Sequence, residues 1–264
     1  MRISIDHTTR YLYEAPVRYS TQYLRVVPQS SVRQKVIEWR LDTPVPALEL
    51  RDGYGNILHV LTIDRPVREI VIRSAGIVET TASIDETADE VPLSPLVFLR
   101  QTALTRAEGS LVELAETFRP QAESVLGMQE LAEEVVKRLP FQHGVTEVHS
   151  TAAEALEAGN GVCQDHAHVF ITCCRHLGIP ARYVSGYMYS PGLAQAEVAS
   201  HAWAEAWLTG RWRSFDVTNR RPAGERHIRL AVGADYLDAC PVRGVRSGGG
   251  EEQMIASALM GDEQ

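Results

Sequence analysis

The stretch Gly159-Asn160-Gly161-Val162-Cys163-Gln164-Asp165-His166-Ala167-His168 leads from a glycine-bearing loop into a cysteine that opens a helical pattern. Apolar residues then recur at the spacing of one helix face, at Cys163, Ala167, Phe170, Cys174 and Leu177. Gly178 follows as a stop signal, and Pro180 lies two residues beyond it. The pattern predicts a buried helix over residues 163–177, with Cys163 in its first turn.

A cysteine in the first turn of a helix has a chemical environment of its own. The N–H groups of that turn have no partner inside the helix, and the helix dipole is positive there. Both effects favour a thiolate, and the same N–H groups can hold a developing oxyanion. A lone cysteine at such a place is more often a small packing residue. The case for chemistry at Cys163 therefore depends on the rest of the chain.

Two later stretches supply a histidine and an aspartate. Residues 200–208 alternate large or polar side chains with alanine, residues 211–218 form a second strand pattern, and Thr209-Gly210 between them is typical of a two-residue hairpin loop. This loop predicts the pairs Leu208 with Arg211, Trp207 with Trp212, Glu205 with Ser214 and Trp203 with Asp216. His201 then lies diagonally from Asp216 on the same face, within reach of a carboxylate. Such a carboxylate fixes the imidazole tautomer and leaves the other ring nitrogen free to deprotonate a thiol.

With these residues in place, the chain resembles the bacterial transglutaminase-like family, which has a papain-like Cys-His-Asp core. The resemblance lies in residues 161–168, 177–187, 200–207 and 215–219, and it continues through 226–229, 231–236 and 241–245. Residues 8–13 and 52–56 resemble the β domain that precedes the core in this family. The resemblance implies that Cys163 is the nucleophile, His201 the general base and acid, and Asp216 the orienting carboxylate.

The chain departs from the family pattern at two positions. The family usually has Asp-Pro-Thr-Asn where this chain has Asp216-Val217-Thr218-Asn219. The aspartate is intact, so its implied role is kept. An aromatic residue that is often tyrosine is Phe141 here, so no hydroxyl is available at that position.

The order of the segments predicts an α+β protein with two domains. Residues 1–85 contain short alternating strands separated by turn residues, which indicates an N-terminal β-sandwich-like domain. An acidic connection with two prolines follows, so we place the boundary between 1–85 and 86–264. The second part is expected to be a transglutaminase/papain-like catalytic domain, with the cysteine helix packed on an antiparallel sheet. Within it we expect helices over 110–118, 127–139 and up to 158, a strand over 181–189, an irregular segment over 219–246 with one short helix near 232–237, and a last strand over 254–260.

Several other polar residues have competing interpretations. His143 and His149 lie in a loop, where solvated histidines are more common than catalytic ones. Tyr183, Tyr187 and their neighbours on one strand face are expected either to line a substrate groove or to pack against the helix. A metal site built from Cys163, Asp165, His166 and His168 is disfavoured, because these side chains point in different directions around a helix. We therefore expect no metal and no cofactor.

Composition limits the classes of partner and compartment. The 264 residues are 44% hydrophobic and 23% charged, which is ordinary for a globular protein, and the formal net charge is −8. Without a Lys/Arg-rich run, a nucleic-acid partner is not expected. The chain shows no signal-peptide pattern and no long apolar run, so we expect no membrane association. Four cysteines in such a chain predict a reducing, cytoplasmic compartment.

The function expected from the sequence is thiol-dependent acyl transfer on a peptide or isopeptide amide through a Cys163 thioester. Hydrolysis by a cysteine protease or amidase is favoured, because water is always present and the sequence shows no evident amine site. Transfer to an amine, as in a transglutaminase, uses the same core chemistry. A non-catalytic protein-binding module on the same fold is the alternative from another class. The oligomeric state, including a homo-oligomer, is left open.

Overall fold

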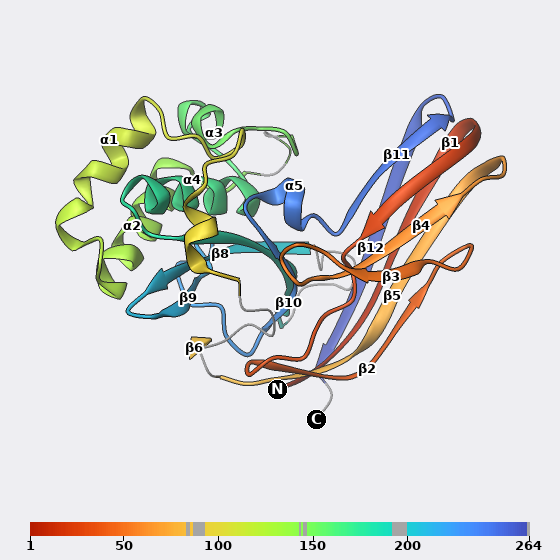
Figure 1. Ribbon diagram of the computed structural model, residues 1–264, viewed down its shortest axis with the longest axis horizontal. Coiled ribbons are helices and arrows are strands. Elements are labelled where there is room, and N and C mark those ends of the chain that lie inside the picture. Colours follow the sequence, from red (N-terminus) through yellow and green to blue (C-terminus); the bar gives the residue numbers. More distant parts are fainter. Residues whose placement is uncertain (83–84, 87–92, 143, 145–146, 192–199, 263–264) are drawn as a thin grey trace.

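The protein consists of a long curled sheet and a helix-covered sheet. The computed structural model describes residues 1–82, 85–86, 93–142, 144, 147–191 and 200–262. In Figure 1 the helices α1 to α4 lie on one side of the molecule and the long strands of the other sheet lie opposite them. The mixture confirms the α+β class. Among the described residues, no helix is both long enough and apolar enough to cross a bilayer.

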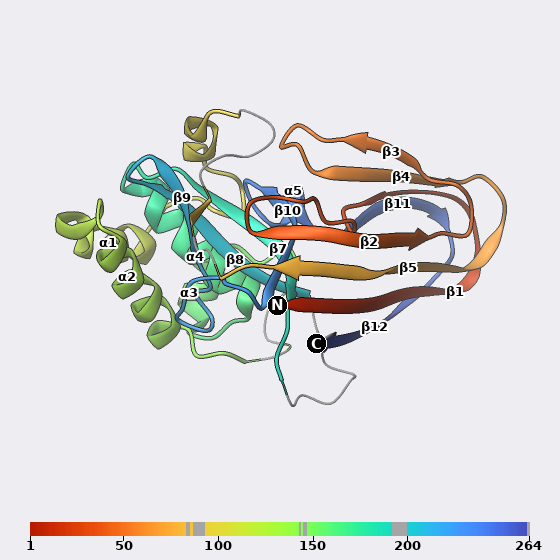
Figure 2. The ribbon, with the colours of Figure 1, turned by 90° about the horizontal axis from the view of Figure 1, so that it is seen from below.

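The larger sheet is built around one long N-terminal strand. Its seven strands are β1 (Arg2–Leu24), β2 (Gln34–Asp42), β3 (Leu48–Arg51), β4 (Ile57–Ile63), β5 (Val67–Thr80), β11 (Val242–Gly248) and β12 (Glu252–Asp262). The first half of β1 pairs with β5 and β12, and its second half pairs with β4 and β11. Buried residues such as Ile3 and Ile5 alternate with polar neighbours along β1. All seven strands belong to one curled antiparallel sheet that continues through β1 (Figure 2). Ile70 of β5 and Leu61 of β4 lie in the same buried cluster, so the two halves of this sheet pack on each other as in the predicted sandwich-like domain.

The C-terminal strands do not follow the predicted division of the chain after residue 85. β11 and β12 run antiparallel to β1, so the chain after the catalytic segment returns to complete the N-terminal sheet. The predicted range 86–264 had placed these strands with the catalytic domain. The long pairing from Ile3–Asp262 to Tyr13–Glu252 satisfies one edge of β1, and no local pattern in the sequence indicates that partner.

The smaller sheet carries the cysteine helix on one face. Its strands are β6 (Asp85–Glu86), β7 (Ala181–Met188), β8 (Ser200–Leu208), β9 (Arg211–Phe215) and β10 (His227–Gly233), in the order β10-β7-β8-β9-β6. The helices are α1 (Ser110–Thr117), α2 (Val125–Arg138), α3 (Ala152–Ala158), α4 (Cys163–His176) and α5 (Tyr236–Ala239), with 3-10 turns η1 (Pro95–Leu99) and η2 (Arg119–Gln121). The alanines of β8 at 202, 204 and 206 join Ala167 and Phe170 of α4 in one buried cluster. Small side chains on the strand let the helix approach closely, so the predicted packing of this helix on an antiparallel sheet is confirmed.

The β8–β9 hairpin has the predicted register at three of the four predicted pairs, but β9 ends at Phe215, before the predicted pair of Trp203 with Asp216. Leu208 pairs with Arg211, Trp207 with Trp212 and Glu205 with Ser214. The loop residues Thr209 and Gly210 both have positive φ, at 52° and 78°, as a two-residue type I′ turn requires. The segment 219–246, in contrast, is not irregular as expected, because it contains β10, α5 and β11. The alternation of Ile228, Leu230 and Val232 is the strand signal that the sequence interpretation missed.

The N-terminal sheet closes the free edge of β10 with side-chain amides. The Gln34 amide donates to the Arg229 carbonyl and accepts from its N–H, both at 2.8 Å. Asn56 makes the same pair of bonds to Val232, also at 2.8 Å. Both side chains are buried. The two sheets are thus joined by groups that satisfy the outward backbone of a strand in the smaller sheet.

Replacing Gln34 with leucine is expected to lower the free energy of unfolding by about 1–3 kcal/mol, because the N–H and carbonyl of Arg229 would lose their partners in a buried place. Urea unfolding of the wild type and the variant measures the difference. Gln253→Leu, at an exposed position of β12, is the matched control and should change stability by no more than about 0.5 kcal/mol. Equal effects of the two substitutions would contradict this account of the sheet junction.

Candidate active site

Cys163 is the first residue of α4 and is half-buried, whereas Cys173, Cys174 and Cys240 are buried; all four are free thiols. The carboxylate of Asp165 accepts a hydrogen bond from the Val162 N–H at 2.8 Å, which fixes the start of the helix. A Cβ at Gly161 would approach the Cβ of Asp165 to 2.9 Å, so a glycine is required for this contact. The Gly-Val-Cys-Gln-Asp sequence therefore holds the thiol at a defined helix end.

The structure brings together the three residues predicted from the sequence. The Cys163 thiol lies near enough to His201 to help raise the pKa of that imidazole. On the other side of the ring, Nε2 of His201 lies 3.0 Å from Oδ1 of Asp216, in a contact with the geometry of an ion pair rather than of an aligned hydrogen bond. Since Nε2 faces the carboxylate, Nδ1 is the ring nitrogen available to the thiol. This Cys–His–Asp order is the order needed to move a proton off the sulfur.

Charge in the site favours a protonated imidazole. Burial by itself would lower the pKa of His201, but Asp216 and Cys163 outweigh it and raise that pKa to about 9. Burial would raise the pKa of Asp216, but His201 and then His227 hold it well below its usual range. At neutral pH the site thus holds an imidazolium between a carboxylate and a sulfur atom.

Asp216 accepts from two residues that the sequence interpretation did not assign to the site. Its Oδ2 lies 2.9 Å from Nε2 of His227 and 2.8 Å from Nδ2 of Asn219, and its Oδ1 accepts from the Asn219 N–H at 3.2 Å. Asn219 is the last residue of the 215–219 motif that contains Asp216, so its position three residues after Asp216 could have predicted this contact. His227 comes from β10, whose strand pattern was missed, and only the fold places it here.

His201, Asp216 and His227 have ligand atoms within 4.8 Å of one another, which is close enough for a shared metal ion. The hydrogen bonds favour another arrangement. The Gly224 N–H donates to Nδ1 of His227 at 3.1 Å, so Nδ1 carries a lone pair and the ring proton must be on Nε2. Nε2 then has no lone pair for a metal. The geometry therefore favours a hydrogen-bonded carboxylate at this place.

The residues considered for a metal site around Cys163 bind separate partners. Asp165 caps α4, His166 contacts Thr218 at 2.9 Å and the Leu139 carbonyl at 2.7 Å, and His168 accepts from the Tyr236 N–H at 3.1 Å. Burial lowers the pKa of both histidines, that of His168 to about 3. These three side chains support the helix and its neighbours rather than a common ligand.

Among the remaining candidates, Tyr183 lies within electrostatic range of the Cys163 thiol. Tyr183 and Tyr187 are buried in two different apolar clusters, which supports packing over a substrate groove. Phe141 is exposed and its ring lies 6.3 Å from that of His166. His149 is exposed, and His143 lies outside the described residues.

The His201–Asp216 pair is expected to make stability depend on pH. His201 titrates near 6.5 when unfolded and at about 9 when folded, so its contribution is complete below pH 6.5 and is lost as the pH rises through 9. Asp216, with a pKa of 3.8 when unfolded, contributes above that pH, and its contribution is lost as the pH falls further. We expect the stability difference between wild type and His201→Leu to fall by about 2–3 kcal/mol from pH 6 to pH 9.5. Urea titrations of both proteins across this range measure it, and a constant difference would contradict the ion pair.

Family models match both parts of the chain. The model described as the transglutaminase-like superfamily matches residues 112–217, and the model described as the bacterial transglutaminase-like N-terminal region matches residues 3–79. The first range contains Cys163, His201 and Asp216. His227 and the C-terminal strands lie outside both ranges.

Two relatives and a solved structure are similar to this chain over nearly all of its length. An uncharacterized protein of Mycobacterium leprae is 32% identical over 94% of this chain and 94% of its own length. An uncharacterized protein of Mycobacterium tuberculosis is 31% identical over 96% of this chain and 90% of its own length. The structure named "Putative Cysteine Protease from Cytophaga hutchinsonii" has a TM-score of 0.79 with 22% identity, covering 100% of this chain and 92% of that one, which establishes a common fold.

Proposed function

Because the chain belongs to the bacterial transglutaminase-like family, we propose that it transfers acyl groups from amides through a thioester on Cys163. The observation that carries this proposal is the position of His201, whose Nε2 lies 3.0 Å from Oδ1 of Asp216 and whose pKa is raised by both Asp216 and Cys163. The role of each group follows from its position among these three residues. Cys163 is the nucleophile, His201 the proton acceptor and donor, and Asp216 the carboxylate that orients the imidazolium and stabilises its charge.

The reaction begins with the proton of the Cys163 thiol already on Nδ1 of His201, in the imidazolium described above. The sulfur attacks the amide carbonyl, and the N–H groups of the first turn of α4 face the developing oxyanion. The C–N bond breaks as His201 returns its proton to the departing amine, which leaves a thioester. Water then attacks the thioester, His201 accepts its proton and gives it back to the sulfur, and a carboxylic acid and the free thiol remain.

We propose a peptide or isopeptide amide as the acyl donor and water as the usual acceptor, that is, a cysteine protease or amidase. An amine that reaches the thioester before water would give a transglutaminase reaction with the same residues. A reducing compartment such as the cytoplasm suits this chemistry, because a reactive thiol is kept reduced there.

The first test is the rate of alkylation of each cysteine by iodoacetamide against pH, measured by peptide mass spectrometry. We expect Cys163 to react at a pH well below that of an ordinary thiol, near 8.5, and His201→Ala to remove this advantage. The buried Cys173, Cys174 and Cys240 are internal controls, since burial raises the pKa of each.

If Cys163 reacts like an ordinary thiol in the folded protein, the enzyme proposal fails and a binding module is favoured. If it reacts early, amide donors are screened with and without added amines. Release of a carboxylic acid in the presence of amine supports hydrolysis, and incorporation of the amine supports acyl transfer to amines.

A further inference from the structure

We propose that His227, which lies outside the Cys–His–Asp set, is a positioning residue for that set. Its electrically neutral ring donates a hydrogen bond to Asp216 and so holds the carboxylate in place. The proposal rests on the acyl-transfer function argued above. It assigns a role to a residue of β10, a strand outside the ranges that match the family models.

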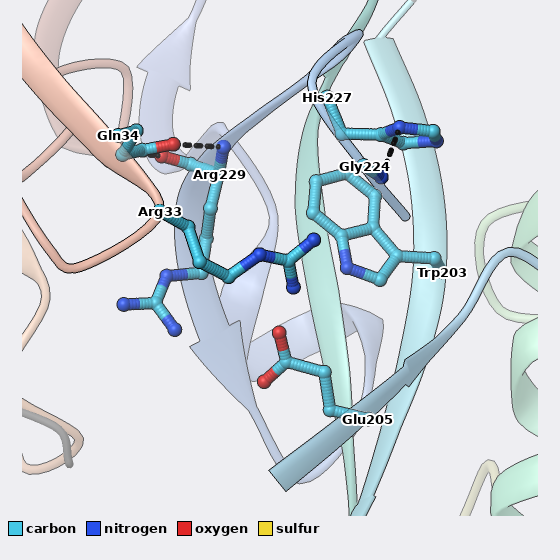
Figure 3. A pocket seen from close by; sticks show the side chains of 7 residues that line it. All are labelled: Arg33, Gln34, Trp203, Glu205, Gly224, His227 and Arg229. Atoms are coloured by element: carbon cyan, nitrogen blue, oxygen red, sulfur yellow. Dashed lines mark hydrogen bonds between the residues drawn. The ribbon is translucent and has the colours of Figure 1, made fainter. Parts of the chain in front are cut away.

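The protonation state of His227 follows from its two contacts. The Gly224 N–H can only donate, and it points to Nδ1 of His227, as Figure 3 shows. Nδ1 therefore has a lone pair, the proton lies on Nε2, and Nε2 donates to Oδ2 of Asp216 at 2.9 Å. Burial, which lowers the pKa of His227, agrees with a neutral ring.

A neutral donor suits the carboxylate of a catalytic pair. His227 and Asn219 together hold Oδ2, which turns Oδ1 toward His201. A second imidazolium at position 227 would share the negative charge of Asp216 and weaken its hold on His201. With His227 neutral, the orientation of Asp216 is fixed while its charge remains available to His201.

The fold fixes His227 from both sides. Upstream, the backbones of Asp216 and Arg221 pair across a tight loop. Downstream, Gln34 holds the backbone of Arg229, two residues beyond His227, as the second dashed contact in Figure 3 shows. The ring of Trp203 packs edge-on against the imidazole, with centroids 5.3 Å apart. The N-terminal sheet therefore takes part in placing a residue at the catalytic carboxylate.

Several charged groups surround His227, and a substitution at this position must be judged against its effect on them. Asp216, His201 and Arg221 act on it electrostatically. Arg33, Glu205 and Arg229 line the small pocket on its other side. A phenylalanine at 227 leaves these charged groups in the sequence, keeps an aromatic ring at the position and removes the ring nitrogens.

The test compares the alkylation of Cys163 against pH in the wild type and three variants of the full chain. In His227→Phe we expect the pH at which Cys163 becomes reactive to rise by about one unit, because a misaligned carboxylate supports the His201 imidazolium less well. His227→Gln offers both an amide donor for Asp216 and a carbonyl for Gly224, and should restore more than half of this shift. His59→Phe, in β4 of the other sheet, replaces a half-buried histidine as the matched control and should leave the profile unchanged.

Three results would overturn the role of His227. They are an unchanged profile in His227→Phe, equal shifts in the Phe and Gln variants, and a wild-type ring protonated on Nδ1 in nitrogen-15 NMR between pH 6 and 8. The NMR measurement decides the question if a variant does not fold. If wild-type Cys163 itself shows no early reactivity, the acyl-transfer proposal has failed instead, and the two failures are thus distinguished.

Discussion

Replacing Cys163 with alanine is expected to lower turnover of an activated acyl donor, such as p-nitrophenyl acetate, by about 10⁴-fold or more. In the proposed mechanism the thiol is the only group of the protein that forms a bond to the acyl carbon, so its loss leaves no route to the thioester. Intact-protein mass spectrometry should show an added acetyl group on Cys163 in the wild type and none there in the variant.

The fold is expected to survive this substitution. Cys163 is half-buried at the first residue of α4. The start of this helix is held by the Asp165 carboxylate rather than by the thiol. Cys240→Ala, which removes a buried thiol near α5, is the matched control and should keep full turnover. Turnover that persists in Cys163→Ala would mean that another group forms the acyl-enzyme.

The parts of the site that the sequence predicted are those fixed by local geometry. The two-residue loop at Thr209-Gly210 sets the hairpin register, and that register brings His201 to Asp216. The apolar spacing from Cys163 to Leu177 sets the helix and the place of the thiol at its start. Both follow from residues close in sequence, whose spacing determines which side chains share a face.

The parts that the sequence interpretation missed depend on contacts between distant segments. His227 reaches Asp216 only because β10 pairs with β7 and its other edge is held by Gln34, almost two hundred residues earlier. β12 pairs with the first residues of the chain for the same kind of reason. Local periodicity can predict that such a strand exists. Its partner depends on which sheet edges remain open after the rest of the chain has folded.

The surroundings of Asp216 also distinguish this site from one that could use an asparagine in the same place. Among the described residues, every polar contact of the Asp216 side chain is with a donor. Oδ1 faces Nε2 of His201 and the Asn219 N–H, and Oδ2 faces His227 and the Asn219 amide. The site is therefore built for two acceptor oxygens, whereas an asparagine offers one oxygen and one NH₂ group.

Asp216→Asn is accordingly expected to lower turnover by about 10³–10⁴-fold, although the two side chains have nearly the same shape. If the NH₂ group faces His201, Nε2 must become an acceptor, and the proton moves to Nδ1, where it blocks transfer from the Cys163 thiol. If it faces His227 instead, two donors meet in a buried place, which costs about 1–3 kcal/mol, and His201 still loses the charge that raises its pKa to about 9. Turnover and Cys163 alkylation against pH measure both effects. A variant with near wild-type turnover would show that orientation by an amide oxygen is sufficient and that the charge of Asp216 is not needed.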